Sequence, residues 1–332
     1  MHILNEKDYG LMEKLVSLSQ RQLKQLMTKY LKKHYKNVIV TRKYLVAVGD
    51  IPIALVSHMD TVFKVPVRNL YYDKQKNVLW SPQGLGADDR AGVFSIIKII
   101  QSGLRPSIIL TTDEEVGGIG AHSLSRRKCP IPGLKYMIEL DRRGTDDCVF
   151  YDCYNPEFTE YVETFGFKEQ WGSFSDISFL MSAWSICGVN LSIGYRDEHS
   201  VSETLHIDDM FNTIEKVKVM LTQQEIPQFE YLELYTDTWN WFTHGGYGEG
   251  KHQIYGQHCS ICKTLYSEYE LFPVKGRNKK IKYVCPDCVV GVVDWCEYCG
   301  EAYEIEDPAN KNICKECSEK LCTEQSNSNS KE

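Results

Sequence analysis

Four apolar runs each lead into histidine or acidic residues, and this feature constrains the fold more than any other. The runs and the polar residues after them are 53–56 with His58 and Asp60, 108–110 with Asp113 to Glu115, 137–140 with Asp141, and 191–193 with His199. In open α/β sheets, ligands bind beyond the carboxyl ends of the strands. We therefore expect these side chains to converge at one edge of a sheet.

The alternation of strand-like and helix-like segments predicts an α/β fold with a mixed, mostly parallel sheet flanked by helices. Residues 8–33 have apolar residues at helical spacing and predict one helix that packs on the domain. The β-rich runs 38–40 and 44–48 lie too close together for a helical crossover and predict a hairpin. The segment 91–100 is apolar all round, as expected of a buried helix, and 209–222 predicts a closing helix.

A fifth acidic segment places Asp88 and Asp89 in a glycine-flanked loop ahead of the buried helix. Neighbouring carboxylates repel one another, so a cation or protons must stabilise them. A histidine and carboxylate set without clustered thiolates suits hydrolytic zinc, which keeps coordination positions open for water. A single His-x-Asp or Glu-Glu pair is most often structural, but five such motifs together favour a hydrolytic metal centre.

The motifs Ser-His-Met-Asp-Thr-Val at 57–62, Gly-Ala-Asp-Asp-Arg-Ala-Gly at 86–92, Thr-Asp-Glu-Glu-Val-Gly at 112–117 and Glu-His-Ser-Val-Ser-Glu at 198–203 occur in a fixed order. In order and spacing they resemble the co-catalytic di-zinc peptidases. This superfamily includes peptidase T, aminoacylase and the tetrahedral and single-domain zinc aminopeptidases. The resemblance extends from about residue 40 to residue 220.

The resemblance implies a ligand set for two catalytic zinc ions. Asp88 would bridge the two ions, His58 and Asp141 would complete the first, and Glu115 and His199 the second. Cobalt or manganese would also suit these ligands. In this family the peptide bond after the bridging aspartate is typically cis, which here is the bond between Asp88 and Asp89.

Glu114 would be the general base of the reaction, as the resemblance implies. Asp60 lies two residues after His58 and could accept the other N–H of that imidazole, which would fix the ring orientation. His206 and Asp208 are competing candidates for the place of His199. A Ser-Asp pair at 175–176 resembles an element that supports the site in relatives.

We expect a metal-dependent hydrolase of amide bonds, an aminopeptidase or small-peptide peptidase. Two alternatives remain: an N-acyl amino acid deacylase, and an inactive peptidase scaffold with a binding function. Only 57 residues separate Asp141 from His199, so the long lid or dimerisation insertion of peptidase T and aminoacylase is absent.

Nine of the 13 cysteines fall between Cys259 and Cys322. Eight of them form four Cys-x2-Cys pairs, which predict two structural zinc sites of four thiolates each; the eight are Cys259, Cys262, Cys285, Cys288, Cys296, Cys299, Cys314 and Cys317. Sequential pairing would give zinc ribbons and alternating pairing a cross-braced module. The sequence leaves this choice open.

The four glycines among residues 244–250 indicate a break between two domains. We expect a catalytic domain at 1–243, a linker at 244–258, a zinc module at 259–322 and a disordered tail at 323–332. The module would dock a protein partner; a net charge of −7 argues against nucleic acid as the default partner. Without a signal peptide or a long apolar run, the sequence predicts a cytoplasmic protein away from membranes.

Overall fold

The computed structural model describes residues 2–172, 174–232, 256–261, 265–267, 271–275, 281–285, 288, 293–295 and 302–304. The chain divides into two compact units, Met1–Thr238 and Trp239–Glu332. The fold of each unit is described by itself.

The N-terminal unit is built on a sheet of eight strands, mixed and mostly parallel at its centre, as expected. In spatial order the strands are β1 (Asn37–Val40), β2 (Tyr44–Val48), β6 (Pro106–Thr111), β3 (Ile51–His58), β7 (Tyr136–Arg142), β10 (Gly188–Ser192), β8 (Asp147–Val149) and β9 (Lys168–Glu169). The four central strands β6, β3, β7 and β10 run parallel to one another. All four apolar runs singled out in the sequence are therefore neighbours, with their carboxyl ends at one edge.

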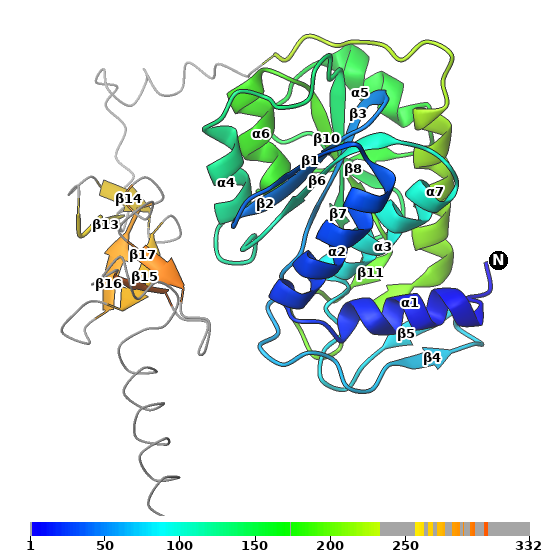
Figure 1. The fold of residues 1–332 in the computed structure, drawn as a ribbon, viewed down its shortest axis with the longest axis horizontal. Helices are drawn as coiled ribbons and strands as arrows, with labels where there is room; N and C mark the ends of the chain where they lie inside the picture. Colours follow the sequence, from blue (N-terminus) through cyan, green and yellow to red (C-terminus); the bar gives the residue numbers. More distant parts are fainter. Residues whose placement is uncertain are drawn as a thin grey trace, which may run out of the picture. The chain divides into compact units, whose positions relative to one another are not determined.

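Helices cover both faces of this sheet (Figure 1). They are α1 (Glu6–Val16), α2 (Gln20–His34), α3 (Ala87–Gln101), α4 (Ile119–Ser125), α5 (Pro156–Glu163), α6 (Asp176–Trp184) and α7 (Ile207–Leu221). On one face α3 packs on β3 and β7 and is itself covered by α1 and α7; on the other, α6 packs on β3, β7 and β10 beside α4. The result is a three-layer α/β/α arrangement.

The helix α3 is buried on every side, as its apolar composition predicts. Its side chains Val93, Phe94, Ile96 and Ile99 have no exposed surface. One side of the helix meets the sheet and the other meets α1 and α7. Burial of this kind stabilises the fold by roughly 1.5–3 kcal/mol per large apolar side chain.

The single helix predicted for residues 8–33 is wrong, because two helices occupy this region. The helix α1 ends at Val16, and Ser19 begins α2. The Ser19 side chain accepts from the Gln22 backbone N–H, and the Gln22 side chain accepts from the Ser19 N–H at 3.0 Å. This capping box provides hydrogen-bond partners for backbone N–H groups that are otherwise free at a helix start, and it therefore favours a second helix beginning here.

The predicted hairpin is confirmed, since β1 and β2 pair antiparallel. The next strand, β3, does not continue it, although only Gly49 and Asp50 separate β2 from β3. Instead β6 lies between them, antiparallel to β2 and parallel to β3. This crossover places the acidic segment after β6 beside the end of β3.

A smaller antiparallel sheet completes the N-terminal unit; its strands, in order, are β11 (Tyr195–Arg196), β12 (Thr204–His206), β5 (Val78–Trp80) and β4 (Tyr71–Asp73). The C-terminal unit contains a pair, β13 (Gly256–His258) with β14 (Leu265–Ser267), and a sheet of β16 (Ile281–Val284), β15 (Phe272–Lys275), β18 (Ala302–Glu304) and β17 (Val293–Trp295). The strand β13 occupies the last three residues of the range predicted as linker.

Candidate metal centre

The strand register brings the predicted ligands to one place. His58 ends β3 and is paired with Thr111 of β6, directly ahead of the segment that contains Glu114 and Glu115. On the other side of β3, the register pairs Val56 with Glu139 of β7. Two residues further along each strand, Asp141 therefore lies opposite His58. The ligands therefore meet because parallel strands end together.

Asp88 lies at the centre of the resulting acidic-histidine cluster. Its Oδ1 is 3.0 Å from His58 Nε2, and its Oδ2 is 3.1 Å from His199 Nε2. Its peptide bond to Asp89 is cis, as the resemblance implies. With one oxygen toward each histidine, the Asp88 carboxylate has the arrangement of a bridging ligand.

The cluster consists of two overlapping groups whose possible ligand atoms all lie within 4.8 Å of one another. The inner group is His58, Asp88 and Asp141, with His58 Nε2 3.7 Å from Asp141 Oδ1. The outer group is Asp88, Glu115 and His199, with His199 Nε2 3.0 Å from Glu115 Oε2. The structure thus brings together all five residues chosen from the sequence.

The surroundings of the cluster suit a pair of divalent cations. Three carboxylates crowd against two imidazoles, and Oε1 of Glu115 is buried without a hydrogen-bond partner. A buried carboxylate oxygen that lacks a donor is costly unless a cation or a proton satisfies it. Imidazole nitrogen and carboxylate oxygen are also the ligands of hydrolytic zinc sites.

The carboxylates of the cluster raise the pKa of both imidazoles. Burial would lower the pKa of the His58 imidazole, but Asp141, Asp60 and Asp88 outweigh burial and raise that pKa well above its ordinary value. Hydrogen bonds to Asp88 and Glu115 raise the pKa of His199 to about 11. Imidazolium protons thus supply the charge that metal ions would bring.

Glu114 lies beside the cluster on the turn after β6. Burial raises the pKa of its carboxyl well above the ordinary value, and nearby carboxylates add to the shift. Asp60 holds this turn, because its two carboxylate oxygens accept the backbone N–H groups of Glu114 and Glu115, each at 3.1 Å. Asp60 Oδ1 also lies 3.3 Å from His58 Nδ1. Asp60 therefore joins the end of β3 to the acidic turn.

Three side chains surround Asp141, and two of them, Tyr195 and Asn190, were not singled out from the sequence. Tyr195 donates its hydroxyl to Asp141 Oδ1 at 3.1 Å, and Ser175 donates to Oδ2 at 3.2 Å. The Asn190 side chain accepts the Asp141 N–H at 2.9 Å and donates to the Asp141 carbonyl at 2.7 Å. Asn190 was detectable in principle, as a polar residue inside an apolar strand. Of the Ser-Asp pair, Ser175 supports the site, as expected.

Glu203 ties the loop that contains His199 to the loop that contains Asp88. It is almost fully buried, and its carboxylate accepts the backbone N–H groups of Gly86 at 2.5 Å and of Asp88 at 3.0 Å. His206 and Asp208, the alternatives to His199, belong to neither group. His206 instead precedes α7, and Asp208 accepts from the N–H of His2.

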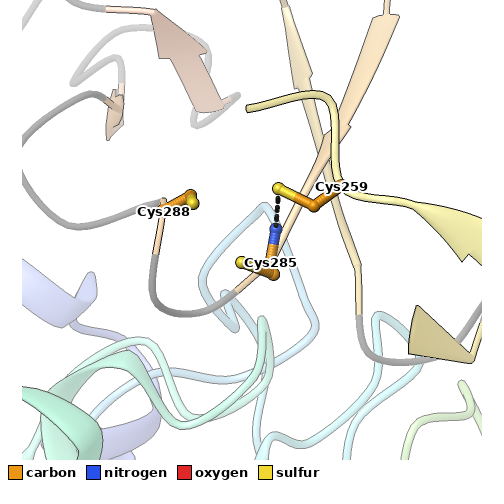
Figure 2. Close-up of side chains that lie close together, drawn as sticks. All are labelled: Cys259, Cys285 and Cys288. Carbon is orange, nitrogen blue, oxygen red and sulfur yellow. Dashed lines mark hydrogen bonds between the residues drawn. The ribbon is translucent and has the colours of Figure 1, made fainter. Parts of the chain in front are cut away.

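A second candidate metal site lies in the C-terminal unit, where the thiols of Cys259, Cys285 and Cys288 gather (Figure 2). Their sulfur atoms lie within 4.8 Å of one another. Cys259 Sγ accepts the N–H of Cys285 at 3.3 Å and that of Ile261 at 3.4 Å. Cys259 of the first Cys-x2-Cys pair therefore lies with both cysteines of the second pair, which agrees with sequential pairing.

The other predicted zinc ligands lie outside the described residues; they are Cys262, Cys296, Cys299, Cys314 and Cys317. In the described part of the chain, no helix is long and apolar enough to cross a membrane.

Several solved structures share the fold. Aminopeptidase PepT from Bacillus cereus is 15% identical, with 66% of this chain and 99% of that chain covered and a TM-score of 0.51. A tripeptidase from Staphylococcus aureus is 14% identical, with 66% and 98% covered and a TM-score of 0.54. A TET aminopeptidase from a marine sediment thaumarchaeon is 15% identical, with 67% and 98% covered and a TM-score of 0.53. No family model and no curated protein matches the sequence.

Proposed function

We propose that this protein is a metal-dependent aminopeptidase that hydrolyses small peptides. The observation that supports it most is the placement of Asp88 between two histidine and carboxylate groups, with Glu114 beside them. The neighbours that share the fold, an aminopeptidase, a tripeptidase and a TET aminopeptidase, agree with this proposal.

Two divalent ions, zinc by preference and cobalt or manganese as substitutes, would occupy the acidic-histidine cluster. His58 and Asp141 would hold the inner ion, Glu115 and His199 the outer ion, and Asp88 both. When bound, such ions act as Lewis acids that polarise a carbonyl and make water more acidic.

The chain itself supplies the proton transfer. We assign Glu114 as the general base that takes a proton from the attacking water and returns it to the leaving amine. Its raised pKa makes it a better proton acceptor than an ordinary carboxylate and allows it to act as an acid afterwards. Asp60 positions Glu114 through the backbone contact described above.

Substrate would approach from the outer group. The His199 side chain is 53% exposed, whereas that of His58 is 1% exposed. The Asp88 and Asp141 side chains are only 10% and 7% exposed, so the scissile bond would reach the cluster on the His199 side.

For the C-terminal unit we propose a structural zinc site of Cys259, Cys285 and Cys288 with Cys262 as the fourth ligand. A second site would use the remaining two Cys-x2-Cys pairs. Thiolate ligands that close the coordination sphere stabilise a small fold and leave no open position for chemistry. The module would then serve to dock a protein partner or to present substrate.

The test is hydrolysis of a peptide panel by the full chain after zinc, cobalt or manganese loading. The panel pairs each free-amine peptide with its N-acetyl form, which separates aminopeptidase from deacylase activity. Glu114→Gln should lower kcat by about 100- to 10,000-fold while bound metal is retained. Glu157→Gln, at an exposed position on α5, serves as the matched control.

Two outcomes would count against the proposal. If the metal-loaded wild-type protein cleaves nothing in the panel, the aminopeptidase function is wrong. If Glu114→Gln keeps the wild-type kcat, the protein is a peptidase with a different base.

A further inference from the structure

Three consecutive backbone amides on the acidic turn are each held by a side chain from a distant part of the chain. The N–H groups of Glu114 and Glu115 donate to Asp60, as described above. The N–H of Asp113 donates to the side-chain carbonyl of Gln20 at 2.9 Å. Gln20 is the first residue of α2 and lies 93 positions earlier in the chain.

Gln20 contacts Asp113 with both ends of its amide. While Oε1 accepts the backbone N–H, Nε2 donates to Asp113 Oδ1 at 2.9 Å. The other carboxylate oxygen, Oδ2, lies 3.2 Å from Lys43 Nζ. Both oxygens of Asp113 therefore have a partner, and the residue is fixed at its backbone and at its side chain.

Asp113 needs this support because of its backbone conformation. Its φ is +61°, in the left-handed region that residues with a Cβ rarely adopt. The conformation costs roughly 1 kcal/mol and persists where the surroundings enforce it. The next residue is Glu114, so a change in the Asp113 conformation would move the Glu114 carboxylate directly.

We infer that Gln20 is a positioning residue for Glu114, through its two hydrogen bonds to Asp113. The inference rests on the proposed role of Glu114 as general base. The helix α2 would thus have a role in catalysis, because it holds the turn that contains Glu114, in addition to packing on the sheet. A displacement of a catalytic group by about 1 Å can lower the reaction rate by up to about 100-fold. A turn that holds Glu114 in place would therefore raise the rate.

The start of α2 does not depend on Gln20, which permits a matched control. The capping box is formed by Ser19 and Gln22. Gln20→Ala removes both contacts to Asp113 and leaves the capping box intact. Gln22→Ala, two positions away, removes the side-chain half of the capping box, keeps the backbone N–H bond to Ser19, and leaves the contacts to Asp113 in place.

The experiment measures three quantities for the two variants in the full chain: kcat and KM, bound metal, and hydrogen exchange of a peptide that spans residues 112–118. For Gln20→Ala we expect kcat to fall about 10-fold with KM changed less than about 2-fold. Both catalytic ions should remain bound, and exchange at residues 113–115 should be faster. For Gln22→Ala we expect wild-type kcat and faster exchange only in α2.

Hydrogen exchange requires no activity, so it separates this inference from the proposed function. If the wild-type protein cleaves no peptide, the proposed function is wrong. Faster exchange in Gln20→Ala would then show that the contact of Gln20 with Asp113 stabilises the turn but has no role in catalysis. Unchanged exchange at residues 113–115, or faster exchange with wild-type kcat, overturns the positioning role. An equal loss of kcat in Gln22→Ala also overturns it, because the loss would then come from a weakened helix.

Discussion

The two halves of the acidic-histidine cluster share Asp88 but have different surroundings. In the inner half, His58 ends a buried strand, and Asp141 is contacted by Tyr195 and Ser175. In the outer half, His199 lies on a loop between β11 and β12 with a positive φ of 61° and a half-exposed side chain. Under the proposed function, the inner half would retain its ion, whereas the outer half would exchange its ion and bind substrate.

The largest expected effect comes from the one residue that both halves share. Asp88→Asn keeps the shape of the side chain but removes the charge that both ions require. We expect loss of both catalytic ions and at least about a 1,000-fold fall in kcat/KM. Metal analysis and peptide hydrolysis measure the two effects. Retention of one catalytic ion would show that the halves bind metal independently of Asp88.

The second prediction compares the two histidines in metal-free protein. His58→Ala should lower the free energy of unfolding by about 2 kcal/mol or more, because it leaves buried carboxylates without their counter-charge. His199→Ala should lower it by less than about 1 kcal/mol, because the side chain is half exposed. Urea unfolding measures both values. Equal losses would remove the distinction between the halves.

The third prediction concerns the rate of metal loss. Dialysis of the loaded protein against a chelator should remove one catalytic ion several-fold faster than the other, with activity falling in the fast phase. Metal analysis at successive times follows the loss. His199→Ala should abolish the fast phase, whereas Glu157→Gln should preserve both phases. Loss of both ions at one rate would argue against separate halves.

The smallest expected effect is a pH dependence of stability in metal-free protein. Burial raises the pKa values of Asp176 and Glu203 to about 7 each. The folded pKa lies above the unfolded value, so this stabilisation is complete below about pH 4 and is lost as the pH rises through 7. We expect Tm to fall by at least about 3 °C between pH 5 and pH 8.

Glu203→Gln provides the control for this measurement, because it removes one of the buried carboxyls whose pKa is raised. The decline of Tm with pH should become shallower in this variant. The lowered pKa values of Asp60 and Asp88 act below this pH range and do not alter the sign. A Tm that rises with pH would contradict the prediction.

The sequence was sufficient to predict the parallel core of the sheet and the gathering of the ligands. His58, Glu115, Asp141 and His199 each follow an apolar strand, and parallel strands end at a common edge, so local patterns were enough for these four. Asn190, Tyr195 and Glu203 were missed because their roles depend on which backbone and side-chain atoms lie opposite them. Such contacts follow from strand register and loop conformation, which one sequence does not determine.

The one wrong helix and the strand order that was not predicted have similar causes. The break between α1 and α2 depends on the capping box of Ser19 and Gln22, a short signal within a long apolar pattern. The place of β6 between β2 and β3 depends on pairing across more than 50 residues. The pairing of the cysteines was open for the same reason. Figure 2 shows Cys259 together with Cys285 and Cys288.

The convergence of four strand ends also has a consequence for how the protein is made. His58 leaves the ribosome early in synthesis, and His199 emerges only when most of the N-terminal unit has been translated. Domains fold largely as units during synthesis, so the acidic-histidine cluster cannot be complete before that point. The proposed activity would thus arise late in synthesis, when the chain that surrounds the cluster is already long enough to enclose it.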